Sequence, residues 1–451
     1  MTQTLHPTTT TETTATSTEE RRTTIRRSSD RVLPADRPNT VSWAPREDQQ
    51  EGGPAASAST ATVPAPAADS SPDSTPASAA RVRPGSLAAV GSPAVRPPAA
   101  AHLSDEQVAE LARELDAVRD EVLCRRGASD AAYIRRVIRL QRVLELAGRG
   151  CLLNAQNKVA WVAGTAMLTF AKIIENMEIG HNVLHGQWDW MRDPDIHSTT
   201  WEWDFVTPST AWQNTHNDLH HRWTNVIGKD RDVGYNVLRM DEDEQWQPRH
   251  ILNPVINAGL APVFEWGIAL YDLELDRVKA GEKSREELMR GLRSVGVKAA
   301  KQFAKDYAAT PVAAELLTGS GKAALIGTVV ANGLRNIWAH SVIFCGHFPE
   351  GAETFTEEMV EGETRGDWYV RQMIGSANID GSKFMHFMTG NLSHQVEHHL
   401  FPDLPSNRYA EVAPQVREIC ARYGLPYTTG PLLKQVGSAW AKVFRLALPT
   451  R

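Results

Sequence analysis

The stretch Gly180-His181-Asn182-Val183-Leu184-His185-Gly186 places two histidines four residues apart, so a helix would turn both imidazoles to one face. Two later stretches repeat the pattern, His216-Asn217-Asp218-Leu219-His220-His221 and His394-Gln395-Val396-Glu397-His398-His399. These three histidine boxes contain eight of the fifteen histidines in the chain. Imidazole is the commonest side-chain metal ligand. The boxes therefore predict one metal centre gathered from distant parts of the sequence.

The chemistry of the ligands narrows the choice of metal. A set that is nearly all imidazole suits zinc, copper, iron or nickel. Zinc takes four ligands, or three with an open position, and the histidines here are too many for one zinc ion. Soluble di-iron bundles rely on carboxylates, whereas histidine dominates these boxes. The zinc protease order H-E-x-x-H does not occur in them. We therefore interpret the boxes as a histidine-rich di-iron site.

The predicted ligands include one histidine outside the boxes. His347 ends an apolar stretch and could reach a site at its end, and His340 lies seven residues earlier near the same helical face. The predicted ligands are His181, His185, His216, His220, His221, His347, His398 and His399. Further candidates, either as ligands or as groups that orient ligands, are Gln395, His394, His340, Asp218 and Glu397. His197, His250 and His386 lie outside any box and are interpreted as structural.

Three mostly apolar segments surround the boxes. They cover residues 141–175, with a polar break at 154–158, then 251–273 and 323–348. A membrane-spanning helix needs roughly 20 apolar residues. We expect an all-α membrane protein with about four transmembrane helices in two hairpins and a cytosolic helical cap that holds the metal site. The Lys/Arg-rich segment 275–307 is expected to be a charged helix on the cytosolic side.

The rest of the chain divides by composition. Residues 1–100 are rich in Thr, Ser, Ala and Pro and are predicted to be disordered, because they cannot bury enough apolar surface. Ser104 and Gln107 form a capping-box pattern that opens an amphipathic helix. A second helix, near Ser129, carries an arginine cluster that could face either anionic lipid or solvent. We assign residues 101–430 to the catalytic domain and 431–451 to a C-terminal tail.

Bulk properties exclude several classes of protein. A net charge of −6 and a pI near 6.2 give no sign of nucleic-acid binding. The four cysteines form no C-x-x-C pair, so neither a disulfide framework nor a thiolate zinc site is expected. The first residues contain no apolar segment of the secretory type. These features fit a cytosol-facing active site.

About residues 130–430 resemble the membrane fatty acid desaturase superfamily, and most closely the acyl-CoA and acyl-lipid desaturases of the linoleoyl-CoA, or front-end, type. The resemblance rests on the first two boxes and above all on Gln395-Val396-Glu397-His398-His399-Leu400-Phe401-Pro402. Glutamine takes the first position of the third box in the front-end group, which falls on Gln395 here. His394 precedes it, however, so either residue could be that first member. His347-Phe348-Pro349-Glu350-Gly351 resembles the segment that carries the family's additional histidine.

The resemblance implies two non-haem iron ions, with O2 as co-substrate and a fatty acyl-CoA or acyl-lipid as substrate. The reaction would remove two hydrogens from the acyl chain. Many front-end enzymes carry a fused haem domain marked by His-Pro-Gly-Gly, and that motif does not occur in this sequence. The resemblance therefore implies a separate electron donor, a reductase with a ferredoxin- or cytochrome-type carrier, and an integral membrane enzyme whose active site faces the cytoplasm.

Two other functions fit the same boxes. A membrane di-iron hydroxylase or ketolase would insert oxygen instead of removing hydrogen, and the mass of the product separates the two reactions. A non-catalytic membrane metal-binding protein would instead need ionisable groups within its apolar segments. Those segments are nearly uncharged, with Glu265 as an exception, and the histidines cluster at their ends. This pattern favours an enzyme.

Overall fold

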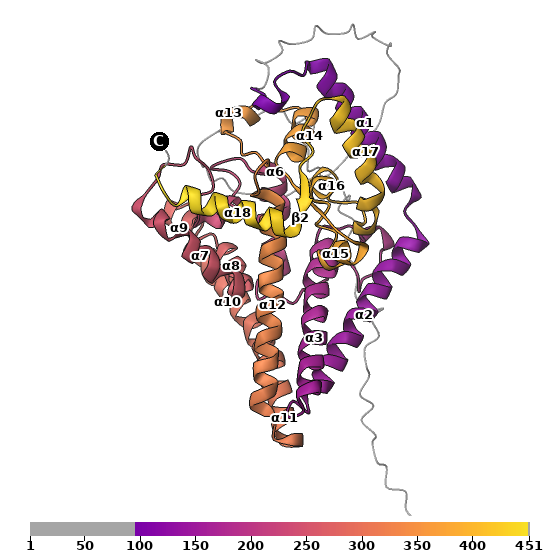
Figure 1. Cartoon of the computed structure of the whole chain (residues 1–451), viewed down its shortest axis with the longest axis vertical. Helices are drawn as coiled ribbons and strands as arrows, with labels where there is room; N and C mark the ends of the chain where they lie inside the picture. Colours follow the sequence, from indigo (N-terminus) through magenta and orange to yellow (C-terminus); the bar gives the residue numbers. More distant parts are fainter. Residues whose placement is uncertain (1–94, 450–451) are drawn as a thin grey trace, which may run out of the picture.

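A computed structural model describes residues 95–449, which form a broad cap above a narrow helical stalk (Figure 1). The predicted disordered region, residues 1–100, lies outside the described residues except for its last six. Those six pack on the cap, where Nε of Arg96 donates to Oδ1 of Asp367 at 2.7 Å.

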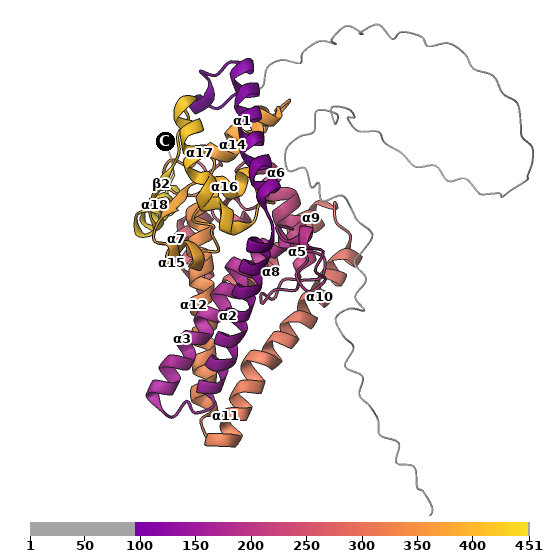
Figure 2. The same ribbon diagram turned by 90° about the vertical axis from the view of Figure 1, so that its right-hand side faces the viewer.

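The stalk contains most of the long helices of the described residues, and they run down together to its tip (Figure 2). They are α2 (Ala128–Leu152), α3 (Lys158–Ile174), α10 (Arg285–Phe303), η9 (Ala304–Ala309), α11 (Thr310–Thr318) and α12 (Gly321–His347). Helices α10, η9 and α11 follow one another without a break in helical geometry. Two local signals make the hairpin turns. Asn157 accepts from the backbone N–H groups of Val159 and Ala160, and Gly319 ends α11 at φ +67°.

Close packing and buried charge hold the stalk together. A Cβ atom on Gly148 of α2 would lie 3.0 Å from the carbonyl oxygen of Gly164 of α3, so the backbones can approach only because both residues are glycine. Higher up, Nζ of Lys172 lies 2.7 Å from a carboxylate oxygen of both Asp204 and Asp306. These ion pairs join α3 to η9 and to the loop below the cap.

The expected membrane segments need correction. Segment 251–273 is not one helix, because Pro254 and Pro262 each start a new short helical piece. The charged segment 275–307 contains the expected helix, α10, which continues through η9 into α11 at the tip of the stalk. Two hairpins are present, but the second pairs α12 with α11 and η9, which follow the charged helix in the chain.

Within residues 95–449, no helix combines the length and the apolar character that crossing a membrane requires. Charged side chains interrupt the apolar sequence of the two longest helices, α2 and α12. Arg135, Arg136, Arg139 and Arg142 lie along α2, and Lys322 and Arg335 lie in α12.

The cap is built on an apolar core between α1 (Asp105–Arg125), α14 (Arg365–Ile374), α16 (Gln395–Leu400) and α17 (Tyr409–Arg422). The predicted capping box is confirmed at the start of α1, where Ser104 and Gln107 bond reciprocally.

The short helices are η2 (Pro98–Ala100), η3 (Glu175–His181), α4 (Asn182–Leu184), η4 (Asp189–Met191), α5 (Ser209–Trp212), η5 (Gln213–His220), α6 (His221–Trp223), η6 (Val233–Asn236), η7 (Pro248–Leu252), α7 (Asn253–Leu260), η8 (Ala261–Val263), α8 (Phe264–Tyr271), α9 (Leu275–Ala280), α13 (Glu357–Val360), α15 (Lys383–Met388) and η10 (Ser406–Arg408).

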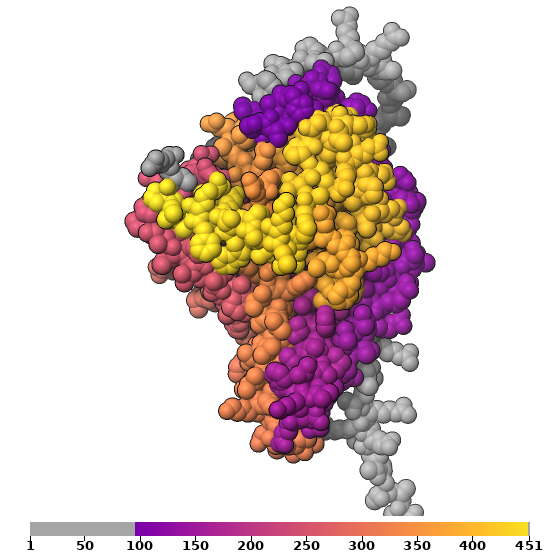
Figure 3. All heavy atoms as spheres, viewed as in Figure 1, coloured from indigo at the N-terminus to yellow at the C-terminus, as the bar shows by residue number. Residues whose placement is uncertain are grey.

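The C-terminal segment belongs to the fold. Strand β2 (Thr429–Pro431) pairs in parallel with β1 (Asn378–Asp380). Helix α18 (Leu432–Leu446) then crosses the base of the cap and buries Ala439, Val443 and Leu446. With α17 it covers much of the face seen in Figure 3. The predicted tail is therefore largely an amphipathic helix packed against α12 and α7.

Candidate metal centre

The first histidine box lies where α3 widens into η3, a π-helical turn that continues into α4. Gly180 is required there, because a Cβ atom would lie 2.8 Å from both the carbonyl oxygen of Glu175 and Cβ of Trp203. The Asn182 amide donates to the carbonyl oxygens of Glu178 and Gly390, at 3.0 and 3.2 Å. The box is therefore tied to the loop before the third box.

The second box lies on another π-helical turn, η5, followed by α6. π-Helical turns are rare and occur frequently at functional sites. Nδ1 of His220 lies 2.9 Å from Oδ2 of Asp230, and Nδ1 of His216 lies 3.6 Å from Oδ2 of Asp232. Because these nitrogens face carboxylates, Nε2 of each ring is directed elsewhere. Nε2 of His216 and Nε2 of His220 are buried and make no hydrogen bond.

The third box begins at the start of α16, and His347 approaches it from the end of α12. Nδ1 of His399 lies 3.0 Å from Oε1 of Gln372, and Nδ1 of His398 lies 3.2 Å from the hydroxyl oxygen of Tyr409. On the other side of the ring, Nε2 of His399 lies 3.1 Å from Nε2 of His347. As in the second box, Nδ1 of His398 and of His399 faces an outer polar group, and Nε2 of His399 faces the other histidines.

All eight predicted histidine ligands come together. Two groups have ring nitrogens within 4.8 Å of one another; they are His181, His185, His216 and His398, and His220, His347 and His399. His221 joins them, since it groups with His398 and His399 and its ring stacks on that of His399 at 4.4 Å between centroids. The two groups lie side by side, and His221 contacts a member of each. They fit two metal ions, and imidazole suits iron.

The electrostatics of the centre suit metal binding. Burial lowers the pKa of His216 to about 4, and it lowers the pKa values of His181, His185 and His398 well below 6.5. These imidazoles are therefore neutral at pH 7, the form that binds metal. His220 differs: burial lowers its pKa, but the carboxylates of Asp230 and Asp232 outweigh burial and raise it to about 9.

Two candidate histidines lie apart from the cluster. Nε2 of His340 lies 3.0 Å from Oδ1 of Asn257, and its ring stacks on Phe344. His394 packs its ring against that of His386, with centroids 4.6 Å apart. The structure brings neither into the metal groups of the described residues.

Gln395 reaches the cluster from the same box. Its side-chain nitrogen lies 2.9 Å from Nε2 of His347. Of the two residues that could open the third box, it is therefore Gln395 that faces the histidines.

The two candidate carboxylates take other positions. Asp218 is exposed on the outer side of η5. Glu397 is buried, but it accepts from the Asn378 amide at 2.9 Å and from the Tyr427 hydroxyl at 2.7 Å, so it anchors α16. The carboxylates that face the histidine rings are Asp230 and Asp232 instead. The box patterns did not predict them because both lie outside the boxes, although aspartates ten and twelve residues after His220 were the available signal.

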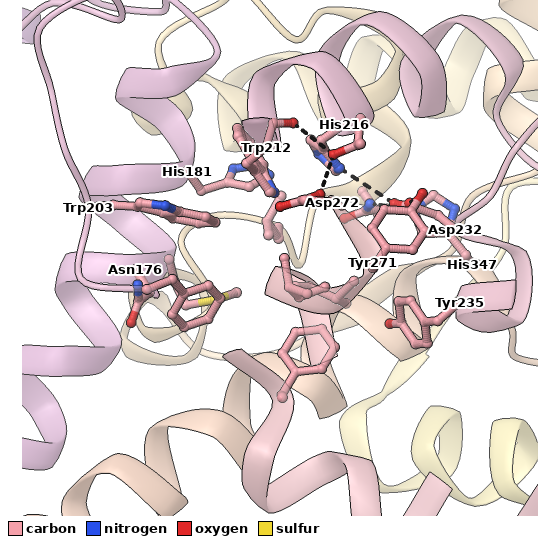
Figure 4. Close-up of a pocket in the computed structure, with 18 residues that line it drawn as sticks. Asn176, His181, Trp203, Trp212, His216, Asp232, Tyr235, Tyr271, Asp272 and His347 are labelled. Atoms are coloured by element: carbon pink, nitrogen blue, oxygen red, sulfur yellow. Dashed lines mark hydrogen bonds and ion pairs between the residues drawn. The ribbon is translucent and has the colours of Figure 1, made fainter. Parts of the chain in front are cut away.

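A cavity opens beside the cluster, and His181, His216 and His347 form part of its wall (Figure 4). Most of the remaining wall is apolar or aromatic, namely Met177, Trp203, Phe205, Trp212, Phe264, Ile268, Ile343 and Leu392. The wall also contains polar residues near the histidines, among them Asp232, Tyr271 and Asp272. Such a cavity suits a hydrocarbon chain whose methylenes pass the metal groups.

The fold and the site define a helical metalloenzyme with a cavity for an apolar substrate. Sequence comparison gives its family. The model of the family described as "Fatty acid desaturase" matches residues 158–431, from the start of α3 to the end of β2. The chain belongs to the fatty acid desaturase family and is an oxidoreductase that desaturates fatty acyl chains.

Individual relatives agree with this assignment. The NADPH-dependent stearoyl-CoA 9-desaturase of Mycobacterium tuberculosis is 51% identical over 352 residues, which cover 78% of this chain and 82% of the relative. The sn-1 linoleoyl-lipid 6-desaturase of Synechocystis is 26% identical over 278 residues, covering 60% of this chain and 76% of the relative. Fatty acid desaturase 3 of Homo sapiens is 41% identical over 71 residues, 16% of each chain.

Proposed function

We propose that this chain introduces a double bond near the middle of a long saturated acyl chain carried as its CoA thioester, at position 9 of a stearoyl chain. The observation that carries the proposal is the apolar cavity whose wall includes His181, His216 and His347. The choice of substrate is supported by the stearoyl-CoA 9-desaturase at 51% identity. The linoleoyl-lipid 6-desaturase is only 26% identical, so position 9 is favoured over a front-end position.

The histidine groups would hold two iron ions. One ion would take His181, His185, His216 and His398, the other His220, His347 and His399, with His221 between them. Bound iron supplies, with O2, the oxidant for removal of two hydrogens. In the balanced reaction, one O2 takes up the two hydrogens of the acyl chain together with two electrons and two protons. The products are two waters and a carbon–carbon double bond.

The protein's own groups orient the ligands and the chain. Asp230 and Asp232 hold the Nδ1 atoms of His220 and His216, which leaves each Nε2 for metal. The aromatic wall excludes water and places one pair of methylenes beside the cluster. Gln395 orients His347 from the cavity side.

The two electrons must come from a donor. The relative from M. tuberculosis is named NADPH-dependent, and we place NADPH at the start of the electron path here as well. A separate reductase with a ferredoxin- or cytochrome-type carrier would deliver the electrons one at a time at the cap.

We place the stalk in a membrane, with the metal centre on its cytoplasmic side. Apolar side chains are exposed over the whole lower stalk, for example Val159 at 77%, Leu316 at 81% and Leu317 at 68%. Exposed apolar side chains in this number favour an interaction with lipid or another apolar partner. Directly above it, α2 exposes Arg135, Arg136, Arg139 and Arg142, which suit anionic lipid headgroups.

The test is turnover of stearoyl-CoA deuterated at carbons 9 and 10 by the full chain in detergent, with NADPH, a ferredoxin reductase, ferredoxin and O2. We expect a product that has lost one deuterium from each carbon, detected by mass spectrometry. His185→Ala, His220→Ala and His398→Ala should each abolish the reaction and lower the iron content. His197→Ala is the matched control, because His197 lies outside the cluster. A product that gains one oxygen would establish a hydroxylase instead.

A further inference from the structure

Two consecutive polar residues at the end of α8, Tyr271 and Asp272, lie in the wall of the acyl cavity (Figure 4). Asp272 is buried, with 6% of its surface exposed. A carboxyl group beside a hydrocarbon chain is unfavourable unless it serves another purpose, because burying a polar group costs free energy. Binding of an acyl chain therefore does not explain why this pair lies here.

Asp272 accepts hydrogen bonds from two threonine hydroxyls, one of which belongs to η5, the helix of the second histidine box. Oγ1 of Thr215 donates to Oδ1 of Asp272 at 2.5 Å, and Oγ1 of Thr207 donates to Oδ2. Thr215 directly precedes His216 in η5. The carboxyl group thus fixes the turn of η5 from which the box projects.

Tyr271 reaches the imidazoles of the same box through Asp232. Its hydroxyl donates to Oδ1 of Asp232. Oδ2 of Asp232 in turn lies 3.6 Å from Nδ1 of both His216 and His220. The Arg231 guanidinium lies 5.0 Å above the Tyr271 ring and holds it in place.

These contacts reach the π-helical segment η5 at Thr215 and, through Asp232, at His216 and His220. A π-helical turn is rare because it is less stable than an α-helical one, so tertiary contacts must maintain it. The two contacts come from neighbouring residues of one helix, and α8 also carries Phe264 and Ile268 into the same cavity. A displacement of α8 would therefore move both contacts together.

We propose that Tyr271 and Asp272 are positioning residues that hold His216 and His220 in place through Asp232 and Thr215. The proposal rests on the proposed function, since it takes the box to be an iron site. It adds that the helix forming one wall of the acyl cavity also sets the geometry of the metal ligands.

The test is a double-mutant cycle on the full chain, with iron per chain measured after timed dialysis against a chelator. We expect Asp272→Ala and Thr215→Val each to speed iron loss about tenfold, as for other groups that orient metal ligands. The double variant should lose iron no faster than Asp272→Ala alone, because that substitution already removes the bond to Thr215. Thr215→Ser keeps the hydroxyl and should behave as wild type. Leu270→Ala, at an exposed position of the same helix, is the matched control.

Three outcomes would overturn the proposal. They are unchanged iron retention in Asp272→Ala with only KM raised, additive effects in the double variant, or failure of Thr215→Ser to restore retention. If Asp272→Ala does not fold, the Thr215→Val and Thr215→Ser pair decides alone, with the melting temperature of each measured alongside. Wild-type protein that binds no iron would overturn the proposed function, whereas iron-loaded wild type with equally stable iron in Thr215→Val would overturn only this inference.

Discussion

Nδ1 of His220 lies 2.9 Å from Oδ2 of Asp230, and both side chains are 1% exposed. This buried pair is the closest contact between a carboxylate and any histidine of the cluster in residues 95–449. Asp230 also accepts from the backbone N–H groups of Asn225 and Asp232, so its position is set by the chain around it.

Replacing Asp230 by Asn should weaken iron binding 10- to 100-fold, because the neutral amide cannot fix the His220 tautomer as a carboxylate does. Iron content and desaturation rate at limiting iron measure the effect. Asp218→Asn, at an exposed position of the same segment, should leave both unchanged. Equal iron affinity in the two variants would show that Asp230 has no part in ligand orientation.

Glu178 should make the protein less stable as pH rises from 5 to 8. Burial raises the pKa of Glu178 to about 7, although Tyr133, Ser406 and Asn391 donate to it. A folded pKa above the unfolded value of 4.5 means that its stabilising contribution is complete below about pH 4.5 and is lost as pH rises through 7. The loss is on the order of 3 kcal/mol.

Glu178→Gln removes this titration. The melting temperature of wild type should therefore fall more steeply between pH 5 and pH 8 than that of the variant, as measured by thermal unfolding in detergent. Parallel pH profiles for the two proteins would rule Glu178 out as the titrating group.

Narrowing the acyl cavity should change the KM for the acyl substrate and the preferred chain length without lowering the iron content. Ile268 lines the cavity, whereas Leu270, two residues later in α8, is 61% exposed. Ile268→Trp should raise the KM for stearoyl-CoA at least tenfold and shift preference to shorter chains, because the larger ring fills space that the chain needs. Leu270→Trp should do neither. A normal chain-length profile for Ile268→Trp would place the substrate elsewhere.

Lys172 should be among the most sensitive positions in the stalk. It is 2% exposed and pairs with both Asp204 and Asp306. Lys172→Met leaves buried carboxylates short of a cation, which costs about 3–5 kcal/mol. Thermal unfolding in detergent should show a lower melting temperature, with Lys434→Met, at an exposed lysine of α18, as the control. A melting temperature equal to that of the control would mean that Arg149 and Lys305 already neutralise the site.

The histidine boxes were predictable because each is a local pattern. A spacing of four residues puts two imidazoles on one helical face wherever that helix lies, and adjacent histidines at the ends of two boxes add further ligands. His347 was also predicted, since it ends a long apolar run. The capping box at Ser104 was predicted for the same reason, because its two bonds span only three residues.

Other features depend on segments distant in sequence. Neither the pairing of α12 with η9 and α11 nor the break of 251–273 at its prolines follows from hydropathy. Asp230 and Asp232 became orienting groups only because the chain after η5 folds back onto it. Glu397, adjacent to two ligands in sequence, is turned away by its bonds to Asn378 and Tyr427.

The sequence by itself predicted which imidazoles lie together and what chemistry they would support, because residue type and short-range spacing decide both. Only the tertiary structure decided how they are held. Burial makes most of the imidazoles neutral, carboxylates from outside the boxes orient His216 and His220, and α8 links the second box to the acyl cavity. These properties arise from contacts between elements far apart along the chain, and no local pattern encodes them.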